Sequence, residues 1–247
     1  MMALDKYNVL DKFPLDGLDE FISQCNERGI SEINMTGSNT DPMLYLHTEK
    51  LKNYLSERIH NLFFKIRTNA VKRDLDLLKF YDGGSVTICS FNNEIYKQMM
   101  GLGKPPDFEK ILQATKHWKD FKVNIVLGDE NVKSGDIHKT LAILERYGVP
   151  KVNLREPYGQ SHIGNPLYSL SSCGSVFGNP FYFYDNGMIV TYWDVHYTEV
   201  ESVNLYANGI VSNTYPVTTG HDPIGGNVLS QENWTKGRHF EQWVSLP

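Results

Sequence analysis

The sequence predicts an α/β protein: a partial (β/α) barrel of the TIM type with parallel strands, followed by antiparallel β-hairpins. Three observations predict this class. From residue 16 to residue 155, short apolar segments alternate with amphipathic segments of helical period, which is typical of βαβ units and a parallel sheet. Each apolar segment ends in polar residues. After about residue 160 the helical period disappears, and strand-like runs flank Asn-Gly pairs.

The expected strands and helices follow from these two periods. Strands are expected at residues 31–36, 62–67, 84–90, 121–127 and 149–155. Helices are expected within residues 16–30, 45–59, 71–81, 92–101, 105–118 and 134–149. In the first helix, apolar residues recur on one face and Gly29 follows as a typical helix end. Strands joined by helices of this length imply right-handed crossovers and a parallel sheet.

The part of the chain after residue 160 is expected to form hairpins packed on the barrel. The runs around Asn186-Gly187, and those around Asn208-Gly209, predict β-hairpins because Asn-Gly favours a two-residue turn. A short helix is expected within residues 233–243. The predicted organisation is therefore a barrel at residues 1–160 and a hairpin extension at residues 161–247 that covers the open end of the sheet.

Charge and composition exclude several function classes. The 247 residues carry a formal charge of −5 without a basic stripe, which disfavours general nucleic-acid binding. No apolar run approaches the roughly 18 residues of a membrane-spanning helix, and the N-terminus lacks an apolar signal-peptide core, so we expect a cytoplasmic protein without membrane contact. Cys25, Cys89 and Cys173 match neither a zinc nor a disulfide pattern, and no residue is predicted to bind a metal.

Polar residues at the strand ends are the candidate ligand-binding residues. The most unusual segment is INMTGSNTDPML at residues 33–44, in which a strand-like pattern ends in residues that favour neither strand nor helix. Because the carboxyl ends of parallel strands meet at one edge of a sheet, where ligands bind in such folds, we expect the candidates to converge there. The candidates are Gly37, Ser38, Asn39, Thr40, Asp41, Arg67, Asn69, Ser90, Asn92, Asn124 and Arg155.

Each kind of candidate also has a structural interpretation. Asp41, followed by proline, suits an Asx-type turn. Ser90, Asn92 and Asn124 suit caps of the helices that follow them. Arg155 suits an ion pair with a nearby carboxylate, and polar residues are common in loops of every function. The sequence leaves these alternatives open.

The order of the strand-end motifs resembles the radical S-adenosylmethionine superfamily, whose core is a partial barrel of six βα units. Residues 37–42, Gly-Ser-Asn-Thr-Asp-Pro, are similar to the family's Gly-Gly-Glu-Pro-like motif, with Asp41 at the acidic position. Arg67-Thr68-Asn69 is similar to the Thr-Asn-Gly segment after the next strand. Residues 90–92, 123–126 and 152–155 are similar to the later strands and strand ends. The resemblance covers roughly residues 12–160.

The resemblance implies an enzyme with S-adenosylmethionine as its cofactor. In the implied reaction, a 5'-deoxyadenosyl radical abstracts hydrogen from an unknown small-molecule or modified-residue substrate, and a reductant such as a flavodoxin or ferredoxin supplies the electron. The implied roles are binding of the cofactor's amino group by residues 38–41, pairing of a carboxylate by Arg155, binding of ribose hydroxyls or carboxylate by Ser90, Asn92 and Asn124, and substrate or cofactor binding by Arg67 and Asn69.

The sequence departs from this family at the iron-sulfur motif. The Cys-x3-Cys-x2-Cys loop that binds three irons of a four-iron four-sulfur cluster is absent, and the three cysteines of the chain cannot replace it at their spacing. The loop normally follows the first strand, so we expect that the first strand and the cluster segment are both missing from this sequence. The chain alone is then expected to bind no iron. Residues 1–12 are expected either to run beside the exposed edge of the strand at 31–36 or to be loosely placed.

Two other functions remain open. A cluster-free homologue would use the same edge as a nucleoside-binding, small-molecule-binding or regulatory protein. An ordinary barrel enzyme would use acid-base chemistry by Asp129, Glu130 and Glu156, provided that two of these carboxylates converge on one substrate. No catalytic residue, substrate identity or oligomeric state is predicted.

Overall fold

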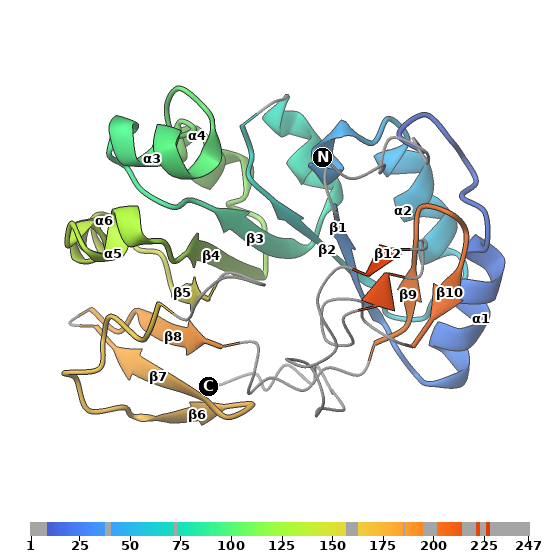
Figure 1. The fold of residues 1–247 in the computed structure, drawn as a ribbon. Coiled ribbons are helices and arrows are strands. Elements are labelled where there is room, and N and C mark those ends of the chain that lie inside the picture. Colours follow the sequence, from blue (N-terminus) through green and yellow to red (C-terminus); the bar gives the residue numbers. More distant parts are fainter. Residues whose placement is uncertain are drawn as a thin grey trace.

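One eight-stranded sheet forms the centre of the protein. A computed structural model describes residues 9–37, 41–71, 74–156, 163–184, 186–194 and 202–213, with the backbone of 221–222 and 226–227. The sheet has the strand order β1-β2-β3-β4-β5-β8-β7-β6 (Figure 1). Its strands are β1 (Glu32–Thr36), β2 (Phe63–Thr68), β3 (Gly83–Thr87), β4 (Asp120–Val126), β5 (Lys151–Arg155), β6 (Gly174–Val176), β7 (Asn179–Phe183) and β8 (Ile189–Trp193).

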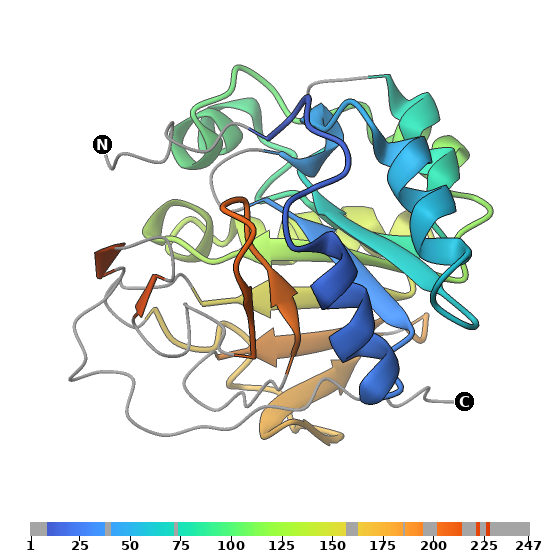
Figure 2. The same cartoon turned by 90° about the vertical axis from the view of Figure 1, so that its right-hand side faces the viewer.

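The first five strands are parallel and lie side by side in chain order. The register pairs Met35 with Ile66 and Val123 with Val152, so apolar residues of neighbouring strands stand on the same face. The ribbon shows the sheet curving, with the helices on its outer side (Figures 1 and 2). The predicted partial barrel with parallel strands is therefore confirmed.

Helices connect the parallel strands, as βαβ crossovers require. Five of the six expected helical segments contain an α-helix, whereas the sixth, residues 71–81, forms the short 3₁₀ helix η3. Asp74 caps η3 by accepting a hydrogen bond from the backbone N of Asp76, and only six residues follow before Tyr81, too few for a long α-helix. The helices are α1 (Leu18–Glu27), η2 (Pro42–Leu44), α2 (Thr48–Ser56), η3 (Leu75–Phe80), α3 (Asn93–Met100), α4 (Phe108–Ala114), α5 (Asp129–Val132) and α6 (Asp136–Arg146).

The hairpin predicted around Asn186-Gly187 is confirmed, but it lies elsewhere than expected. Its strands β7 and β8 are antiparallel, and β8 pairs in parallel with β5, for example Leu154 with Tyr192. The hairpin therefore extends the main sheet rather than covering its open end, because β8 offers β5 apolar residues in register with the buried residues of β5. The division into residues 1–160 and 161–247 stays a prediction.

Short strands follow in the C-terminal part. The hairpin around Asn208-Gly209 is present as β9 (Asn204–Leu205) and β10 (Val211–Ser212), and β11 (His221–Asp222) pairs with β12 (Gly226–Asn227). The helix expected within residues 233–243 lies outside the described residues.

The β9–β10 hairpin packs on the start of α1, as both ribbon views show (Figures 1 and 2). Gly17 precedes α1 at φ +72°, and a Cβ there would lie 2.2 Å from the carbonyl oxygen of Gly209. Gly209 has φ +83°, and a Cβ there would lie 2.6 Å from Cβ of Asp16. Both positions require glycine, since only glycine allows the two turns to approach so closely at positive φ.

The two faces of the main sheet differ in chemistry. Apolar strand residues point outward and pack against the helices, where burial of each large side chain contributes about 1.5–3 kcal/mol. The core of this outer face includes Ile33, Phe64, Ile66, Val86, Val123, Ile125, Val152, Leu154 and Val190 from the strands and Leu18, Leu51, Leu55, Ile137 and Leu141 from the helices. The alternate strand residues form the inner face, which is largely polar. None of the described helices is long and apolar enough to cross a membrane.

Strand β1 lies at one edge of the sheet as described. Of the segment expected beside this edge, residues 1–8 lie outside the described residues. Residues 9–12 form a turn, in which the backbone N of Lys12 donates to the carbonyl of Val9. The carbonyl of Leu10 accepts from the backbone N of Leu46, so this turn lies against the segment before α2 rather than pairing with β1.

Candidate functional site

Asp41 joins the loops that follow β1 and β2. Its Oδ1 accepts a hydrogen bond from the backbone N of Met43 at 2.9 Å. The Thr68 hydroxyl donates to both carboxylate oxygens, at 2.7 and 2.8 Å, and the backbone N of Asn69 donates to Oδ2 at 2.7 Å. Asp41 therefore has the turn-forming contact that its position before a proline suggested, and it also fastens a second loop. A carboxylate has about four acceptor sites, and the single proton of the Thr68 hydroxyl bonds one of the two oxygens at a time, which leaves room for one further donor.

Of the other predicted residues in these two loops, Asn69 contacts Asp41. Besides its backbone bond to Asp41, Asn69 accepts a hydrogen bond at its side-chain oxygen from the backbone N of Val71, at 3.1 Å. Gly37 follows β1 and is exposed. Residues 38–40 lie outside the described residues.

Ser90 and Asn92 shape the start of helix α3. Asn92 is its N-cap and accepts hydrogen bonds from the backbone N of Glu94 at 2.9 Å and of Ile95 at 3.3 Å. The buried Ser90 hydroxyl accepts from the backbone N of Asn92 at 2.8 Å. Asn92 thus has the capping role that served as the alternative to ligand binding, and Ser90 holds the cap residue.

Arg67, Asn124 and Arg155 lie on the inner face near the carboxyl ends of their strands. Because side chains alternate along a strand, register assigns them to one face. Arg67 pairs with Ser85, and the Ser85 hydroxyl accepts a hydrogen bond from the Asn124 side-chain amide at 2.8 Å. Asn124 in turn pairs with Asn153, two residues before Arg155. The fold thus places these three predicted residues on one face of one sheet.

The inner face also contains polar residues that are not among the candidates predicted from the strand ends. Thr87, Asn124, Asn153 and Thr191 form one row across β3, β4, β5 and β8, and only Asn124 is among the predicted residues. The sequence pattern that could have identified these residues lies inside the strands rather than at their ends. Lys-Val-Asn occurs at residues 122–124 and again at 151–153, whereas parallel strands covered on both faces are continuously apolar.

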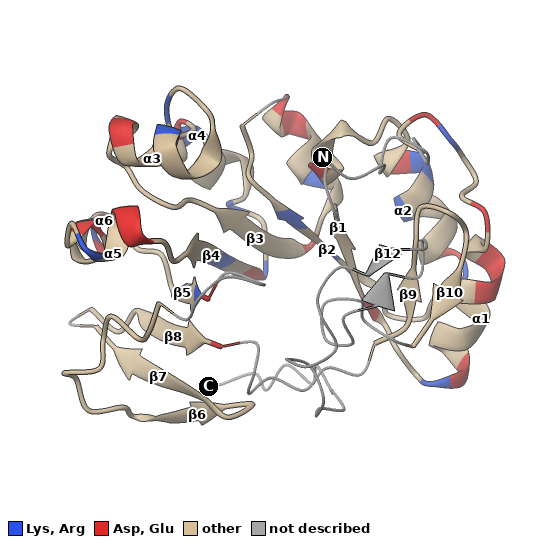
Figure 3. Ribbon diagram, viewed as in Figure 1, with Lys and Arg blue, Asp and Glu red and all other residues tan. Residues whose placement is uncertain are grey.

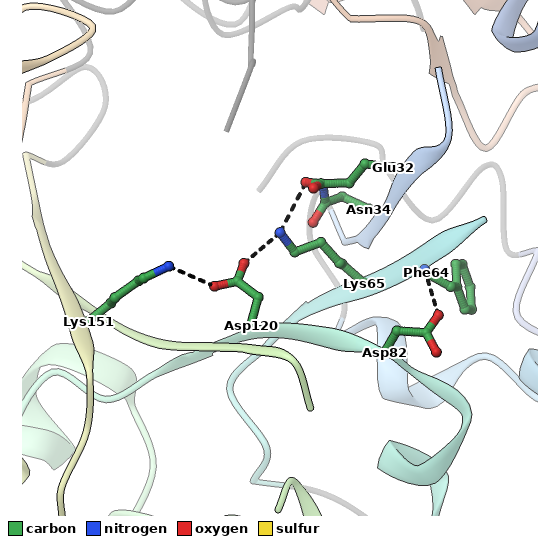
Figure 4. Close-up of polar contacts among 7 residues, drawn as sticks. All are labelled: Glu32, Asn34, Phe64, Lys65, Asp82, Asp120 and Lys151. Atoms are coloured by element: carbon green, nitrogen blue, oxygen red, sulfur yellow. Dashed lines mark hydrogen bonds and ion pairs between the residues drawn. The ribbon is translucent and has the colours of Figure 1, made fainter. Parts of the chain in front are cut away.

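A charged network occupies the inner face at the starts of the strands. The Lys65 side chain is 2% exposed, and its ammonium nitrogen lies 3.1 Å from Glu32 Oε1 and 2.6 Å from Asp120 Oδ2. Lys151 lies 3.4 Å from the other oxygen of Asp120, and Figure 4 shows these side chains pointing toward one another. Burial raises the pKa of Asp120, but the hydrogen bond and charge of Lys65, with the charges of Lys122 and Lys151, bring it below its ordinary value of 3.8.

Several positively charged side chains of the described residues belong to the inner face. Figure 3 shows Lys and Arg on β2, β4 and β5. Among the described residues, the cations of this face outnumber the two carboxylates of the network. These cations are Lys65, Arg67, Lys122, Lys151 and Arg155.

Two of the three carboxylates of the acid-base alternative, Glu156 and Asp129, have other contacts. Glu156 is buried, and its Oε1 accepts hydrogen bonds from the Tyr192 hydroxyl and the backbone N of Gly164, both at 2.7 Å. Its Oε2 accepts from the backbone N of Ile163 at 3.1 Å. Glu156 therefore holds the segment after β5 against β8. Asp129 is exposed and pairs with Lys133 at 2.6 Å.

The cysteines do not form a cluster site. Cys25 lies in the core on α1, Cys89 is buried after β3, and Cys173 is exposed before β6. Burial raises the pKa of both Cys25 and Cys89 to about 11, against smaller opposing effects of Arg28 and of a backbone hydrogen bond, so these thiols are protonated, whereas iron ligands are thiolates. Within the described ranges, no group of three His, Cys, Asp or Glu side chains is arranged to hold a metal ion. These residues do not fit a four-iron four-sulfur cluster.

The fold and the site define an α/β protein with a polar edge and a cationic inner face on a curved, largely parallel sheet. No family model matches the chain, and no curated protein matches it. The chain is similar to solved SuiB from Streptococcus suis bound to S-adenosylmethionine, with 12% identity and a TM-score of 0.49, over 63% of this chain and 37% of that chain. It is also similar to anSMEcpe with bound AdoMet, with 15% identity and a TM-score of 0.44, over 60% of this chain and 44% of that chain.

A third similar structure is HemN from Escherichia coli, a coproporphyrinogen III oxidase and radical SAM enzyme. The identity is 15% and the TM-score 0.43, over 57% of this chain and 36% of that chain. The matched parts thus span less than half the length of these three solved chains. At these identities and TM-scores, the likeness establishes neither a family nor an activity for this chain.

Proposed function

We propose that this chain is the core of a radical S-adenosylmethionine enzyme that binds the cofactor at the carboxyl edge of strands β1–β5. The observation that carries the proposal is the order of the parallel strands in combination with the motifs at their ends. The strands follow one another across the sheet in chain order. Residues 37–42 follow β1, residues 67–69 lie at the end of β2, and residues 90–92 follow β3, in the order that the resemblance requires.

The residues of this edge suit the functional groups of the cofactor. The ammonium group of S-adenosylmethionine is a donor that the remaining acceptor site of Asp41 and the backbone of residues 37–40 accommodate. Its carboxylate suits the guanidinium of Arg155 or of Arg67, since a guanidinium binds carboxylates in a bidentate manner. Asn124 and Asn69 offer amide groups for the ribose hydroxyls. Ser90 and Asn92 contribute by holding the start of α3 at the same edge.

When bound and reduced, S-adenosylmethionine would supply radical chemistry for hydrogen abstraction from a substrate. The task of this chain is to bind and orient cofactor and substrate. The cluster that reduces the cofactor does not fit the three cysteines of this chain, so no step is assigned to it here. The proposal includes a small-molecule or modified-residue substrate, a reductant of the flavodoxin or ferredoxin class, and a cytoplasmic location.

Binding of S-adenosylmethionine to the purified chain tests the proposal. Isothermal titration calorimetry is expected to detect binding, and Arg155→Gln is expected to weaken it about tenfold, the effect of losing one charge-assisted contact. Glu109→Gln, an exposed change on α4, is the control and is expected to bind like the unchanged chain. Absence of binding in all proteins would contradict the proposed function.

A second function, cofactor or nucleoside binding without radical chemistry, is favoured by the misfit between the cysteines and a cluster. S-adenosylhomocysteine and adenosine separate the two functions. A nucleoside-binding or regulatory protein is expected to bind adenosine about as well as S-adenosylmethionine, whereas the radical enzyme core requires the amino acid part of the cofactor. Equal affinities for the three ligands would therefore support the second function over the first.

A further inference from the structure

Asn153 and Trp193 lie on the inner face of two neighbouring strands, close to the carboxyl edge. Asn153 of β5 pairs with Thr191 of β8, and Trp193 follows Thr191 by two residues on the same face. Two residues along a strand span roughly 7 Å. Both side chains are half-buried, whereas Val152 and Tyr192, which point to the outer face, are buried in the core. Asn153 and Trp193 are therefore neighbours on a surface that solvent reaches.

The turn between β6 and β7 brings a second aromatic ring to Trp193. Because β7 runs antiparallel to β8, this turn lies at the carboxyl end of β8 (Figure 1). The ring centroids of Phe177 and Trp193 are 6.3 Å apart at an interplanar angle of 69°, which is edge-to-face geometry. The buried Asn179 side chain donates to the carbonyl of Phe177 at 3.1 Å and accepts from the backbone N of Asp194 at 2.7 Å. Asn179 thus fixes the backbone on both sides of the ring pair.

Phe177 occupies a backbone conformation that phenylalanine rarely adopts. Phe177 and Gly178 are the two residues of the β6–β7 turn, with φ of +50° and +78°. A two-residue turn of this kind favours asparagine before glycine, a pair that this chain uses in two later hairpins. A bulky residue at positive φ is strained, and such strain is concentrated at functional sites. The choice of phenylalanine therefore indicates a role for its ring beyond the turn.

Asn153 and Trp193 also present polar groups to a ligand. Within the part of the chain that the structure describes, neither the Asn153 amide nor the Trp193 indole N–H bonds to the protein, and neither group is buried away from solvent. A carboxamide offers donors and an acceptor, so it can pair with an amide group of a ligand. The side chains available for contact are thus two aromatic rings and one amide, all of them uncharged.

We propose that this site binds an aromatic ring attached to an amide group, and that both belong to the substrate. The ring lies against Trp193 and Phe177, and the amide bonds the side chain of Asn153. As an assignment of substrate class, this inference rests on the proposed function, which places the cofactor at the carboxyl edge, where Trp193 lies beside Arg155. A free aromatic amide and an aromatic residue of a peptide share this chemistry, so both are included.

Two neutral probes separate the ring from the amide. N-acetyltyrosinamide and N-acetylleucinamide carry the same amide groups, but only the first is aromatic. Ligand-observed NMR titrations of the whole chain, without S-adenosylmethionine, are expected to show the tyrosine compound binding about fivefold more tightly, the effect of one aromatic contact. No binding of the tyrosine compound, or equal affinities for the two probes, would overturn the proposal.

Variants of the rings test where the tyrosine compound binds. Trp193→Leu is expected to weaken its binding about fivefold and to leave that of N-acetylleucinamide unchanged. Phe177→Asn replaces the ring with a residue that tolerates positive φ, so the fold is expected to be retained while binding weakens about threefold. Phe183→Leu is the matched control, because Phe183 is an exposed ring at the opposite end of the strands. Equal affinities in these three variants contradict the proposed place of the ring.

A variant of Asn153 tests the amide contact. Asn153→Ala is expected to weaken both probes about fivefold, because both lose the same hydrogen bonds. Asn53→Ala, exposed on α2, is the control and is expected to leave both affinities unchanged. Thermal unfolding checks that each variant is folded. Unchanged binding of both probes to folded Asn153→Ala protein contradicts the amide contact.

A capped pentapeptide with tyrosine at its centre distinguishes the two sources of the ring. Binding at least as tight as that of N-acetyltyrosinamide supports a peptide substrate, and weaker binding supports a free aromatic amide.

The outcome is distinguishable from failure of the proposed function. Protein that binds S-adenosylmethionine but not the tyrosine compound contradicts this inference alone. Protein that binds the tyrosine compound through Trp193 but does not bind S-adenosylmethionine contradicts the proposed function, and the ring site then loses its assignment to a substrate.

Discussion

At the scale of the residue, several polar side chains at the strand ends bind the chain's own backbone. Asp41, Asn92 and Glu156 each accept at least two hydrogen bonds from backbone N–H groups or side-chain hydroxyls of the protein. Orphan N–H groups at helix starts and in loops need such acceptors. A ligand role for these residues therefore has to coexist with a role in holding the loops.

Asp41 is expected to contribute clearly to stability. Asp41→Ala removes the acceptor for three donors in two loops and is expected to lower the free energy of unfolding by roughly 2 kcal/mol, measured by urea denaturation. Asp74→Ala is the matched control, because Asp74 is an exposed cap that accepts from a single backbone N–H. A loss for Asp41→Ala no larger than that for Asp74→Ala would contradict this role.

The pKa of Asp120 predicts a dependence of stability on pH. Because its pKa in the folded protein lies below 3.8, the ionised form contributes stability above that pH, and the contribution is lost as the pH falls below it. Asp120→Asn leaves the buried Lys65 with one carboxylate fewer and is expected to cost about 3 kcal/mol at neutral pH. The difference between the two proteins is expected to shrink in acid. A difference that stays constant from pH 7 to about pH 3 would contradict the assignment.

At the scale of the element, the position of each hairpin depends on the strand or helix that it packs against rather than on the sequence of its turn. The β7–β8 and β9–β10 hairpins both contain Asn-Gly, at 186–187 and 208–209. The first joins the main sheet through β8, and the second packs on α1. Gly187 and Gly209 both have positive φ, but only at Gly209 would a Cβ meet another part of the chain.

This difference supplies a matched pair of variants. Gly187→Ala and Gly209→Ala place alanine at φ +80° and +83°, so both are expected to carry a similar backbone cost of about 1 kcal/mol. Gly209→Ala is expected to cost at least about 1 kcal/mol more, because its Cβ would lie 2.6 Å from Asp16 and force the hairpin away from α1. Thermal unfolding of the two variants measures the difference. Equal losses of stability would show that the contact with α1 does not hold the hairpin.

At the scale of the whole molecule, the sheet has a polar carboxyl edge, where we propose that the cofactor binds, and a largely polar inner face. The carboxyl edge contains the loops after β1–β5, and the inner face continues from β2 across β8 to β7. What the described chain does not provide is a site for a four-iron four-sulfur cluster, since its cysteines lie in three separate places. The proposed radical chemistry therefore requires ligands other than these three thiols.

The corresponding prediction is that this chain alone retains no cluster. After anaerobic reconstitution with iron and sulfide followed by desalting, the 247-residue chain is expected to retain no bound iron and to form no 5'-deoxyadenosine from S-adenosylmethionine. Replacing Cys25 and Cys89 with serine is expected to leave both results unchanged. Stoichiometric iron, or 5'-deoxyadenosine formed by the unchanged chain, would show that the cysteines have been misinterpreted.

The sequence by itself determined the parallel strands β1–β5, both Asn-Gly hairpins and the set of polar strand ends. These features follow from hydrophobic period and turn chemistry, which act between residues that are close in the chain. The segment at 71–81 was the exception, because its leucine spacing suits an α-helix as well as the 3₁₀ helix that forms between Asp74 and Tyr81.

Only the tertiary structure decided which polar residues meet. It placed β8 beside β5, formed the row of Thr87, Asn124, Asn153 and Thr191, and brought Lys65 between Glu32 and Asp120. The physical reason is that strand pairing joins residues tens of positions apart, and its register is chosen by the packing of the whole apolar face rather than by local preference. Alternation within a strand shows that a residue is on one face; the fold decides which residues share it.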